Sequence, residues 1–356
     1  MTIKSSGSSL SFSEISAEFG SSSQRNMGAY RVSTTIGEKT FSLDEGIPSS
    51  GPIRFSDFYG KRLNVVIDCG SGARIVSRSL YNTNDPKVTV IGGLKSRPSS
   101  SSGTRIWIYT NGTITSDIAS INAPNRQYCS LLTGGWESDT DLRIDIGSSG
   151  FITGAGGNGG NGGTTVVNSG SCYVGRNGRF GTSAIGVQYQ PVIITNRGRI
   201  QGGTGGGGGG GTGYGENRRS RRRDIRCYAG GGGGGGGMGI PAGSGGSAGG
   251  GRGGARAGII RTGRAGAAGG PFNQGAGGLG SALSGSGAGA TGGTGGSGGN
   301  TGGSGSGYGF DAQCGAAGGS AGFSGYAIII TNNGTGVTIT NNGTEIGGRA
   351  FSLPPS

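Results

Sequence analysis

Hydrophobic residues occur in short runs along most of the chain, separated by glycine, serine, asparagine and proline. Between residues 63 and 146 these runs are rich in β-branched and aromatic residues, which favours strands over helices. The Asn111-Gly112 pair between two of the runs is typical of a hairpin turn. We therefore expect a small β domain over residues 63–146. Its predicted strands are Leu63–Ile67, Ala73–Ser77, Val88–Ile91, Arg105–Tyr109 and Leu142–Ile146.

Two short aromatic segments in residues 1–62 have helical spacing. In the first, Ser11 can cap a helix with Glu14 at the capping-box position, and Gly20 stops it. The second ends at Gly60. Each is shorter than the roughly 12 residues that an isolated helix needs, so its aromatic face must dock on the rest of this chain or on another protein. The residues of the two faces are Phe12, Ile15, Phe19, Phe55, Phe58 and Tyr59.

Glycine dominates residues 147–349, and a short phrase recurs within this zone. It consists of β-branched residues or an Ile-Thr pair, then Asn, with Gly close behind. The copies are Val166–Gly170, Ile193–Gly198, Ile330–Gly334 and Ile339–Gly343. Such recurrence indicates a repeated structural unit, so we interpret the phrases as strand-and-turn anchors that precede or follow the glycine stretches.

The glycine stretches have a period of three. Residues 156–164 and 292–300 are each three Gly-Gly-X triplets. This period matches an extended helix with three residues per turn, whose backbone groups neighbouring helices can pair. The predicted fold class is therefore mainly β plus a polyglycine type II helix bundle, with short N-terminal helices. A flexible glycine linker is the alternative.

Composition narrows the functional classes. Glycine accounts for 91 of the 356 residues and hydrophobic residues for 31%, which leaves little for a side-chain core. The formal charge of +13 favours anionic partners. No apolar run reaches the roughly 18 residues of a membrane span, and the start of the chain lacks the apolar core of a signal peptide. We therefore expect no membrane insertion, and synthesis and assembly in a cytoplasm.

No group of side chains predicts catalysis or a metal site. Histidine is absent from the sequence, and no nucleophile elbow or carboxylate cluster is evident in the glycine zone. We expect no enzymatic activity and no cofactor. The cysteines stand far apart without CxxC spacing, which favours reduced thiols, with a Cys172–Cys227 bridge as the alternative. They are Cys69, Cys129, Cys172, Cys227 and Cys314.

The anchors, the glycine tracts and the order of the zones resemble the tip adhesins of T-even-type bacteriophage long tail fibres, over a little more than half of the chain. The segments Leu10–Ile15 and Ile53–Gly60 separately resemble stretches near the starts of phage virion proteins. The resemblance implies that residues 1–62 form a virion attachment segment. It also implies that residues 147–349 form a polyglycine-helix domain with display loops, followed by a tail over residues 350–356. It further implies a location in the virion tail, a fibre or other virion protein as partner, and an outer-membrane protein or lipopolysaccharide as receptor.

Two uninterrupted runs, Gly205–Gly211 and Gly230–Gly237, flank a segment with six arginines. If the glycine helices form a rigid slab, the segments that link them are displayed at its ends. Arginine and tyrosine are favoured at binding hot spots. The candidate receptor-binding residues are Tyr173, Arg176, Arg179, Phe180, Tyr189, Tyr214, Arg218, Arg219, Arg221, Arg222, Arg223, Arg226, Tyr228, Phe272, Tyr308 and Phe310. The candidate attachment residues are the two aromatic faces of residues 1–62.

Three other functions remain open at this stage. The chain could hold another virion position, such as a minor tail or head-fibre protein. Arg252-Gly253-Gly254 and the arginine cluster could bind nucleic acid, but this unit occurs once and lacks interleaved aromatic residues. An ice-binding glycine-helix protein would share the triplets but would not need loops rich in arginine and tyrosine. The sequence favours the receptor-binding adhesin.

Overall fold

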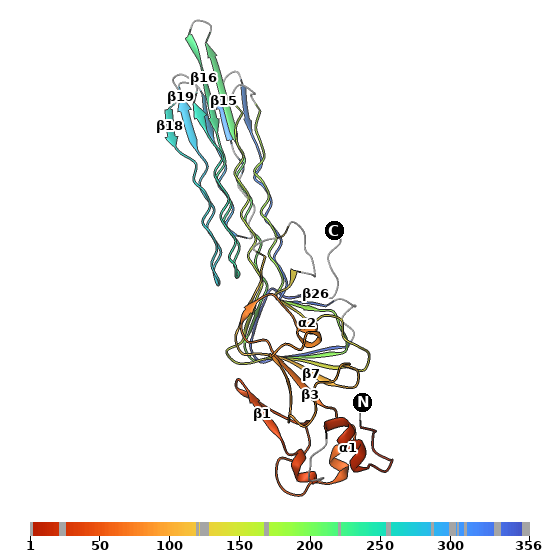
Figure 1. The fold of residues 1–356 in the computed structure, drawn as a ribbon. Helices are drawn as coiled ribbons and strands as arrows, with labels where there is room; N and C mark the ends of the chain where they lie inside the picture. The colour runs from red at the N-terminus through yellow and green to blue at the C-terminus, as the bar shows by residue number, and fades with distance from the viewer. Residues whose placement is uncertain are drawn as a thin grey trace.

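The chain forms an elongated molecule with the N-terminal residues at one end and long, nearly parallel extended segments at the other (Figure 1). The structure is a computed structural model. It describes residues 3–20, 26–118, 121, 128–166, 171–219, 222–253, 258–285, 288–298, 304, 306–309, 312–330 and 336–350. The described residues are mainly β with two short α-helices, which confirms that part of the predicted fold class. None of their helices has the length and apolarity to cross a membrane.

The first aromatic segment of the N-terminal part forms helix α1 (Phe12–Phe19), as predicted. The Ser11 side chain accepts from the backbone of Glu14, the Glu14 side chain accepts in return from the backbone of Ser11, and Gly20 ends the helix. The second segment is a single 3₁₀ turn, η2 (Phe55–Phe58), which follows another, η1 (Met27–Tyr30). A hairpin of β1 (Ser33–Ile36) and β2 (Lys39–Ser42) lies between them and was not predicted.

The two aromatic faces dock on each other. The rings of Phe12 and Phe55 lie 5.0 Å apart, and those of Phe19 and Phe58 lie 6.2 Å apart. Ile15, Phe19 and Phe58 are fully buried. The first pair is edge-on and the second is tilted, and aromatic pairs of this kind add to the stabilisation from buried apolar area.

Three mostly parallel sheets form the middle of the molecule. Each coil of the chain gives one strand to each sheet, beginning with β3, β4 and β5 and ending with β24, β25 and β26, so the coils build a three-faced β-helix. Helix α2 (Ser77–Asn82) follows the first coil. The first sheet has the order β24 (Val337–Asn341), β13 (Val192–Asn196), β10 (Asp141–Ile146), β7 (Arg105–Thr110), β3 (Asn64–Asp68) and β6 (Val88–Val90), with β6 antiparallel to β3. The second is β25 (Thr344–Ile346), β14 (Arg199–Gln201), β11 (Phe151–Thr153), β8 (Thr113–Thr115) and β4 (Gly72–Ala73), and the third is β26 (Arg349–Ala350), β23 (Ile328–Ile330), β12 (Ile185–Val187), β9 (Leu131–Leu132) and β5 (Ile75–Val76).

The β-helix has a side-chain core because successive coils place similar residues in register. In the first sheet one row of aligned residues is Ile67, Ile108, Ile144, Ile194 and Ile339. The first four are buried in one cluster, and Ile339 in the last coil packs against it. The recurring phrase of the sequence is therefore the end of a coil strand in two of its copies. At that corner, the Asn196 amide donates to the side chain of Asn341 over 2.8 Å.

Two local predictions within the β-helix are wrong. Asn111-Gly112 does not close a hairpin: β7 and β8 belong to different sheets, and the pair forms the corner between them. Ala73–Ser77 is two short strands that turn another corner, and Ser77 already begins α2. Each sheet also includes strands from both sides of residue 146, so the change in composition at this position falls at a corner of the coil.

The glycine segments leave the β-helix at one corner, between the second and third sheets. They continue its hydrogen-bond ladders: the Gly154 N–H donates to Gln201, the last residue of β14, and the Ala184 N–H donates to Tyr326. Beyond this corner the chain runs out and back repeatedly (Figure 1). The glycine segments are residues 154–163, 173–182, 202–212, 230–237, 242–250, 262–270, 274–281, 292–298 and 316–326.

Backbone hydrogen bonds between glycine segments recur every third residue. The N–H groups of Gly157, Gly160 and Gly163 donate in turn to carbonyls at 204, 207 and 210. The two uninterrupted glycine runs lie where segments surround them. Gly234, Gly235 and Gly236 donate to Gly160, Gly296 and Ala267, and accept from Gly246, Gly207 and Gly275, over 2.7–2.9 Å.

This packing leaves no room for a side chain at the centre. A Cβ atom on Gly235 would lie 2.0 Å from the Gly275 carbonyl oxygen, and one on Gly207 would lie 2.1 Å from that of Gly296. Outer segments carry another residue at every third position, and its side chain joins the lattice. Asn158 and Asn161, for example, accept from the backbone N–H groups of Ser244 and Ser247.

Two small antiparallel sheets close the far end of the glycine segments. One has the order β17 (Arg252–Gly253), β16 (Arg222–Ala229), β15 (Gly213–Arg219) and β22 (Ala312–Gly315). The other is β18 (Gly258–Arg261), β19 (Ala282–Gly285), β20 (Ala288–Thr291) and β21 (Ser306–Gly309). Between them lies a small core that includes Cys227 and Leu283.

Cys172 and Cys314 form a disulfide at this end. The prediction of reduced thiols is wrong for this pair, and so is the alternative Cys172–Cys227 bridge. Cys69, Cys129 and Cys227 are buried thiols outside any disulfide, and burial raises the pKa of Cys69 and of Cys129 to about 12. The pairing could not be predicted from spacing because the two cysteines are 142 positions apart in the sequence.

Replacing Gly235 with alanine should destabilise the protein, because the new methyl group would meet a carbonyl oxygen that cannot move alone. We expect a loss of at least about 1–3 kcal/mol, as for other overpacked interiors. Gly250→Ala is the matched control, since a Cβ there has no atom within 4 Å. Thermal unfolding followed by circular dichroism checks this. Equal melting temperatures for the two variants would contradict the close-packed arrangement.

Arg105 on β7 pairs with Asp44 of the N-terminal part at 2.7 Å, which joins that part to the β-helix, and with Asp141 on the neighbouring strand β10 at 2.5 Å. Its side chain is 11% exposed and that of Asp44 is 1% exposed. Arg105→Ala would leave a buried charge unpaired, which typically costs about 3–5 kcal/mol. Glu45→Ala removes a neighbouring but exposed pair with Arg143 and should cost less than about 1 kcal/mol. Urea titration of both variants measures the difference, and similar losses would refute it.

Candidate functional site

A hollow of about 390 Å³ opens near the far end of the glycine segments. Three segments wall it, at residues 161–164, 173–176 and 247–248. These positions are distal, because 154–163 starts at strand β11 and 173–182 returns to β12. We call this feature the distal hollow; its lining residues are Asn161, Gly162, Gly163, Thr164, Val166, Tyr173, Val174, Arg176, Ser247 and Ala248.

The backbone of the distal hollow is held firmly. The Tyr173 N–H donates to the Thr212 hydroxyl over 2.6 Å, and the Thr212 N–H donates to the Tyr173 carbonyl over 3.0 Å. The Arg176 N–H donates to the Asn161 carbonyl over 2.9 Å. The hydrogen-bonded glycine segments thus fix the backbone positions of Tyr173 and Arg176.

Apolar side chains project from this fixed frame into solvent. Val174 is 60% exposed, Val166 is 52% exposed and Tyr173 is 37% exposed. Grouped apolar exposure of this kind marks interaction surfaces more often than scattered exposure does. Arg176 is also exposed, and within the described residues no acidic side chain forms an ion pair with it. The distal hollow therefore offers an apolar wall beside a guanidinium group.

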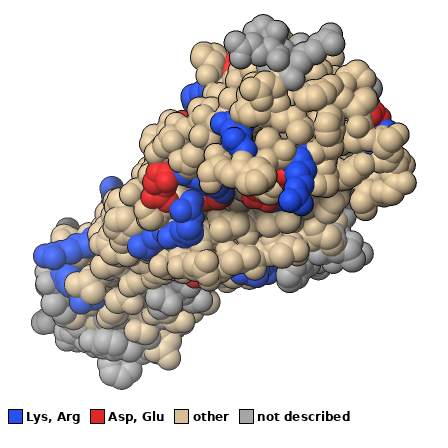
Figure 2. Space-filling view, turned by 90° about the horizontal axis from the view of Figure 1, so that it is seen from below, with Lys and Arg blue, Asp and Glu red and all other residues tan. Residues whose placement is uncertain are grey.

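The positive charge of the chain belongs almost entirely to the glycine-rich part. Residues 147–356 contain fifteen arginines and four acidic residues, whereas residues 1–146 contain fifteen basic and thirteen acidic residues. Near the β-helix, basic groups have acidic neighbours, as Arg197 has in Asp145 at 2.7 Å and Glu38 at 3.0 Å. Figure 2 shows such red and blue groups side by side on the face in view. Because the glycine-rich part has few acids, it favours an anionic partner.

The structure places only some of the predicted receptor-binding residues on an accessible surface. Tyr173 and Arg176 line the distal hollow. Arg179 is exposed and Phe180 is partly exposed, on the same segment but closer to the β-helix. The ring of Phe180 lies 5.3 Å from that of Phe323, which is 70% exposed.

The prediction that Tyr214 and Tyr228 are displayed is wrong. They face each other across β15 and β16 with ring centroids 4.9 Å apart, and each is 2% exposed. Tyr214 donates to Glu216 over 2.5 Å; burial and this bond raise its pKa. Arg226, from the same hairpin, pairs with Glu216 over 2.8 Å. The flanking glycine runs predicted a loop, but the segment is a strand pair whose two tyrosines are buried against each other.

The other arginines of the cluster are only placed by their backbone. Arg218 and Arg219 lie on β15, and Arg222 and Arg223 lie on β16, next to the hairpin end. Arg221 and Phe310 lie outside the described residues, and Tyr308 is placed only as a member of β21. The pairing of β15 with β16 does not favour a flexible arginine-glycine segment for nucleic acid.

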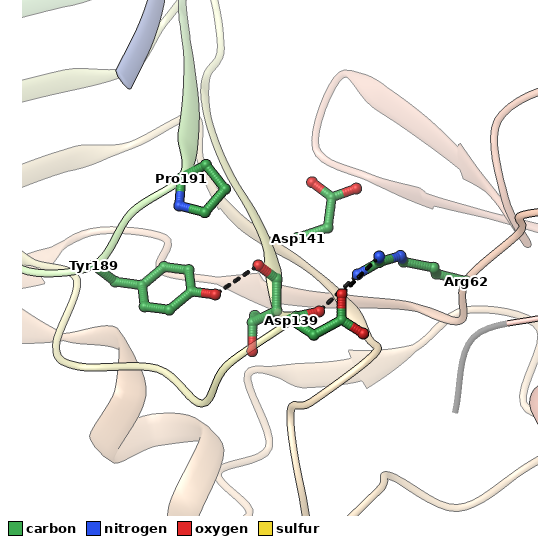
Figure 3. Close-up of a pocket in the computed structure, with 6 residues that line it drawn as sticks. Arg62, Asp139, Asp141, Tyr189 and Pro191 are labelled. Carbon is green, nitrogen blue, oxygen red and sulfur yellow. Dashed lines mark hydrogen bonds and ion pairs between the residues drawn. The ribbon is translucent and has the colours of Figure 1, made fainter. Parts of the chain in front are cut away.

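Phe272 and Tyr189 lie away from the distal hollow. Phe272 occupies the turn at the β-helix end of two glycine segments, where it stacks on Phe151 at 5.5 Å and beneath Arg199. Tyr189 lines a separate pocket of about 330 Å³ with Arg62, Asp139, Thr140, Asp141 and Pro191 (Figure 3).

The residues that line this pocket hold different segments of the chain together. Tyr189 donates to the Thr140 carbonyl over 2.9 Å, and Arg62 pairs with Asp139 over 2.9 Å. Burial raises the pKa of Tyr189. These polar groups bond to one another, so the geometry supports a structural role more than ligand binding.

Sequence reasoning missed Val166, Val174 and Phe323, which together with Phe272 are the most exposed large apolar residues in the described part of the chain. Valine and phenylalanine are ordinarily core residues, and Val166 was assigned to an anchor phrase. The signal that could have found them is the scarcity of any other large side chain in these glycine triplets.

The predicted attachment residues divide into two groups. Ile15, Phe19 and Phe58 are core residues and are inaccessible. Phe12, Phe55 and Tyr59 are partly exposed on the surface of the N-terminal part. An attachment surface built from these residues would thus rest on the latter three.

Neither a scan against protein-family models nor a search of curated proteins found a match. Among solved structures, the chain is similar to the gp37–gp38 adhesin tip complex of the bacteriophage S16 long tail fibre. The TM-score is 0.37 and the sequence identity 19%, over 86% of this chain and 90% of that one. This similarity is too low to support an argument about function.

Proposed function

We propose that this chain is a receptor-binding adhesin of a bacteriophage tail fibre, and that it recognises the host surface through the distal hollow. The observation that carries the proposal is the grouped exposure of Val166, Tyr173 and Val174 beside Arg176, on a backbone that the lattice holds in place. Aromatic and arginine side chains on a rigid frame make effective binding hot spots.

We also propose that the glycine segments are polyglycine type II helices packed as a bundle. The support is their period of three in hydrogen bonding, their lack of α or β structure and the central position of the all-glycine runs. Such a bundle is held together by backbone packing instead of a side-chain core. It therefore suits a rigid spacer that holds the distal hollow far from the β-helix.

The receptor that fits this surface is an outer-membrane protein or lipopolysaccharide. Both present acidic groups, and the two stretches that leave the β-helix, residues 154–184 and 202–327, carry twelve arginines against three acidic residues. Arginine binds carboxylate or phosphate through its planar fork. An apolar wall next to the guanidinium group favours a protein loop over a purely anionic sugar.

The N-terminal part would attach the adhesin to the fibre or to another virion protein, with Phe12, Phe55 and Tyr59 as accessible contacts. It lies at the end of the molecule opposite the distal sheets (Figure 1). In this proposal the chain lies in the virion tail with its receptor-binding end outward. The proposed activity is binding without catalysis. Another virion structural role would use the same attachment end without host recognition.

Binding of the purified chain to a panel of Gram-negative bacteria tests the proposal. The double variant Tyr173→Ala, Arg176→Ala should reduce the bound fraction at least tenfold, because two hot-spot contacts are worth about 1.4 kcal/mol or more together. Phe272→Ala is the matched control: it truncates an aromatic residue of 59% exposure at the opposite end of the glycine segments and should bind like wild type.

The outcomes separate the alternatives. Binding that survives the double variant would place recognition elsewhere on the chain. A folded wild-type protein that binds no bacterium of the panel would favour the virion structural role.

A further inference from the structure

The disulfide occupies a position defined by the period of the lattice. Segment 173–182 runs beside segment 316–326, and the N–H groups of residues 175, 178 and 181 donate to the carbonyls of residues 317, 320 and 323. Every one of these pairs is separated by 142 residues, as are Cys172 and Cys314. The disulfide is thus the next rung of the same ladder, one triplet further from the β-helix.

This last rung adjoins the distal hollow. Cys172 directly precedes Tyr173, and Val174 and Arg176 follow on the same segment. The neighbouring rung, between Gly175 and Ala317, is the longest of the ladder at 3.2 Å, against 2.9 Å and 3.0 Å for the next two. The covalent bond therefore lies at the distal end of the backbone ladder, where the wall of the hollow begins.

The two bridged cysteines differ from the other three in their exposure to solvent. Cys172 and Cys314 are partly exposed, whereas Cys69, Cys129 and Cys227 are fully buried. Thiol reagents attack exposed sulfur and spare buried sulfur. The Cys172–Cys314 bridge is therefore accessible to a reductant in solution.

We propose that the Cys172–Cys314 disulfide is a redox-sensitive clamp that holds the wall of the distal hollow in its binding conformation. The inference rests on the proposed function, since it concerns the regulation of the same surface. The closed bridge keeps Tyr173, Val174 and Arg176 ordered before binding, so that the partner does not bear the cost of ordering them. With the bridge open, segment 173–182 keeps its hydrogen bonds to Asn161, Thr212 and Ala317 but loses its covalent link to Cys314.

The chemistry of opening and closing is thiol–disulfide exchange. One dithiothreitol molecule opens the bridge by forming its own cyclic disulfide, and both protein sulfurs become thiols. In the reverse direction, one oxidised glutathione accepts the two electrons through a mixed disulfide and leaves as two reduced glutathione molecules. No other oxidant or metal is needed.

Bacterial binding of the full chain before and after mild dithiothreitol treatment tests the clamp. Reduction should lower the bound fraction at least fivefold, and reoxidation with oxidised glutathione should restore it. The variant Cys172→Ser, Cys314→Ser should bind like the reduced protein and ignore reductant. Cys69→Ala, which leaves the bridge intact, should keep the redox response of the wild type.

A second measurement separates the clamp from general unfolding. Hydrogen exchange should rise on reduction in residues 171–179 and 312–318, with no change in 230–237. Alkylation of the reduced native protein should modify Cys172 and Cys314 and spare the other three cysteines.

The outcomes are distinguishable from failure of the proposed function. Equal binding by oxidised and reduced protein would overturn the clamp and leave the adhesin standing. Loss of exchange protection throughout the glycine segments on reduction would show the bridge to be a general staple, which also overturns the clamp. No binding in either redox state would contradict the adhesin itself.

Discussion

The approach of one backbone to another without side chains between them is the constraint on which this structure depends. Around Gly235, three consecutive residues donate to three neighbouring segments and accept from three others. An added Cβ would come within about 2 Å of a carbonyl oxygen. A chain so poor in hydrophobic residues can remain ordered here because hydrogen bonds and backbone contact replace the side-chain core. Glycine normally loses the most entropy on ordering, and the dense pairing offsets that cost.

The β-helix sets the register in which the glycine segments begin to pair. Its coils carry an ordinary core, with isoleucines aligned from Ile67 to Ile194, and its ladders run directly into the first glycine residues. Residues 154 and 202 thus leave the corner already in register. The coils of the β-helix thus supply the ordered backbone on which pairing of the glycine segments begins. The distal sheets and the disulfide hold the other end of these segments.

Several features could be predicted from the sequence because local chemistry determines them. The capping box of Ser11 and Glu14, the strands around Ile67, Ile108 and Ile144, and the period of three in the glycine segments all follow from spacing over a few residues. The failures concern contacts far apart in the chain. Asn111-Gly112 has the chemistry of a hairpin, but the register of whole coils makes it a corner. Tyr214 and Tyr228 look displayed between glycine runs, yet they meet across a hairpin and become core. The Cys172–Cys314 pair depends on the path of the 141 residues between them, which no local pattern reveals. Of the candidate binding surface, Tyr173 and Arg176 were found by residue type, while Val166 and Val174 needed the structure.

Amide hydrogen exchange of the two all-glycine runs tests the central claim most directly. If residues 205–211 and 230–237 are paired on every side, their amides should exchange orders of magnitude more slowly than those of an unstructured glycine peptide, and as slowly as the amides of the β-helix strands. Exchange of these runs at the rate of the free peptide, with the β-helix still protected, would show that the glycine segments are a linker and would contradict the account.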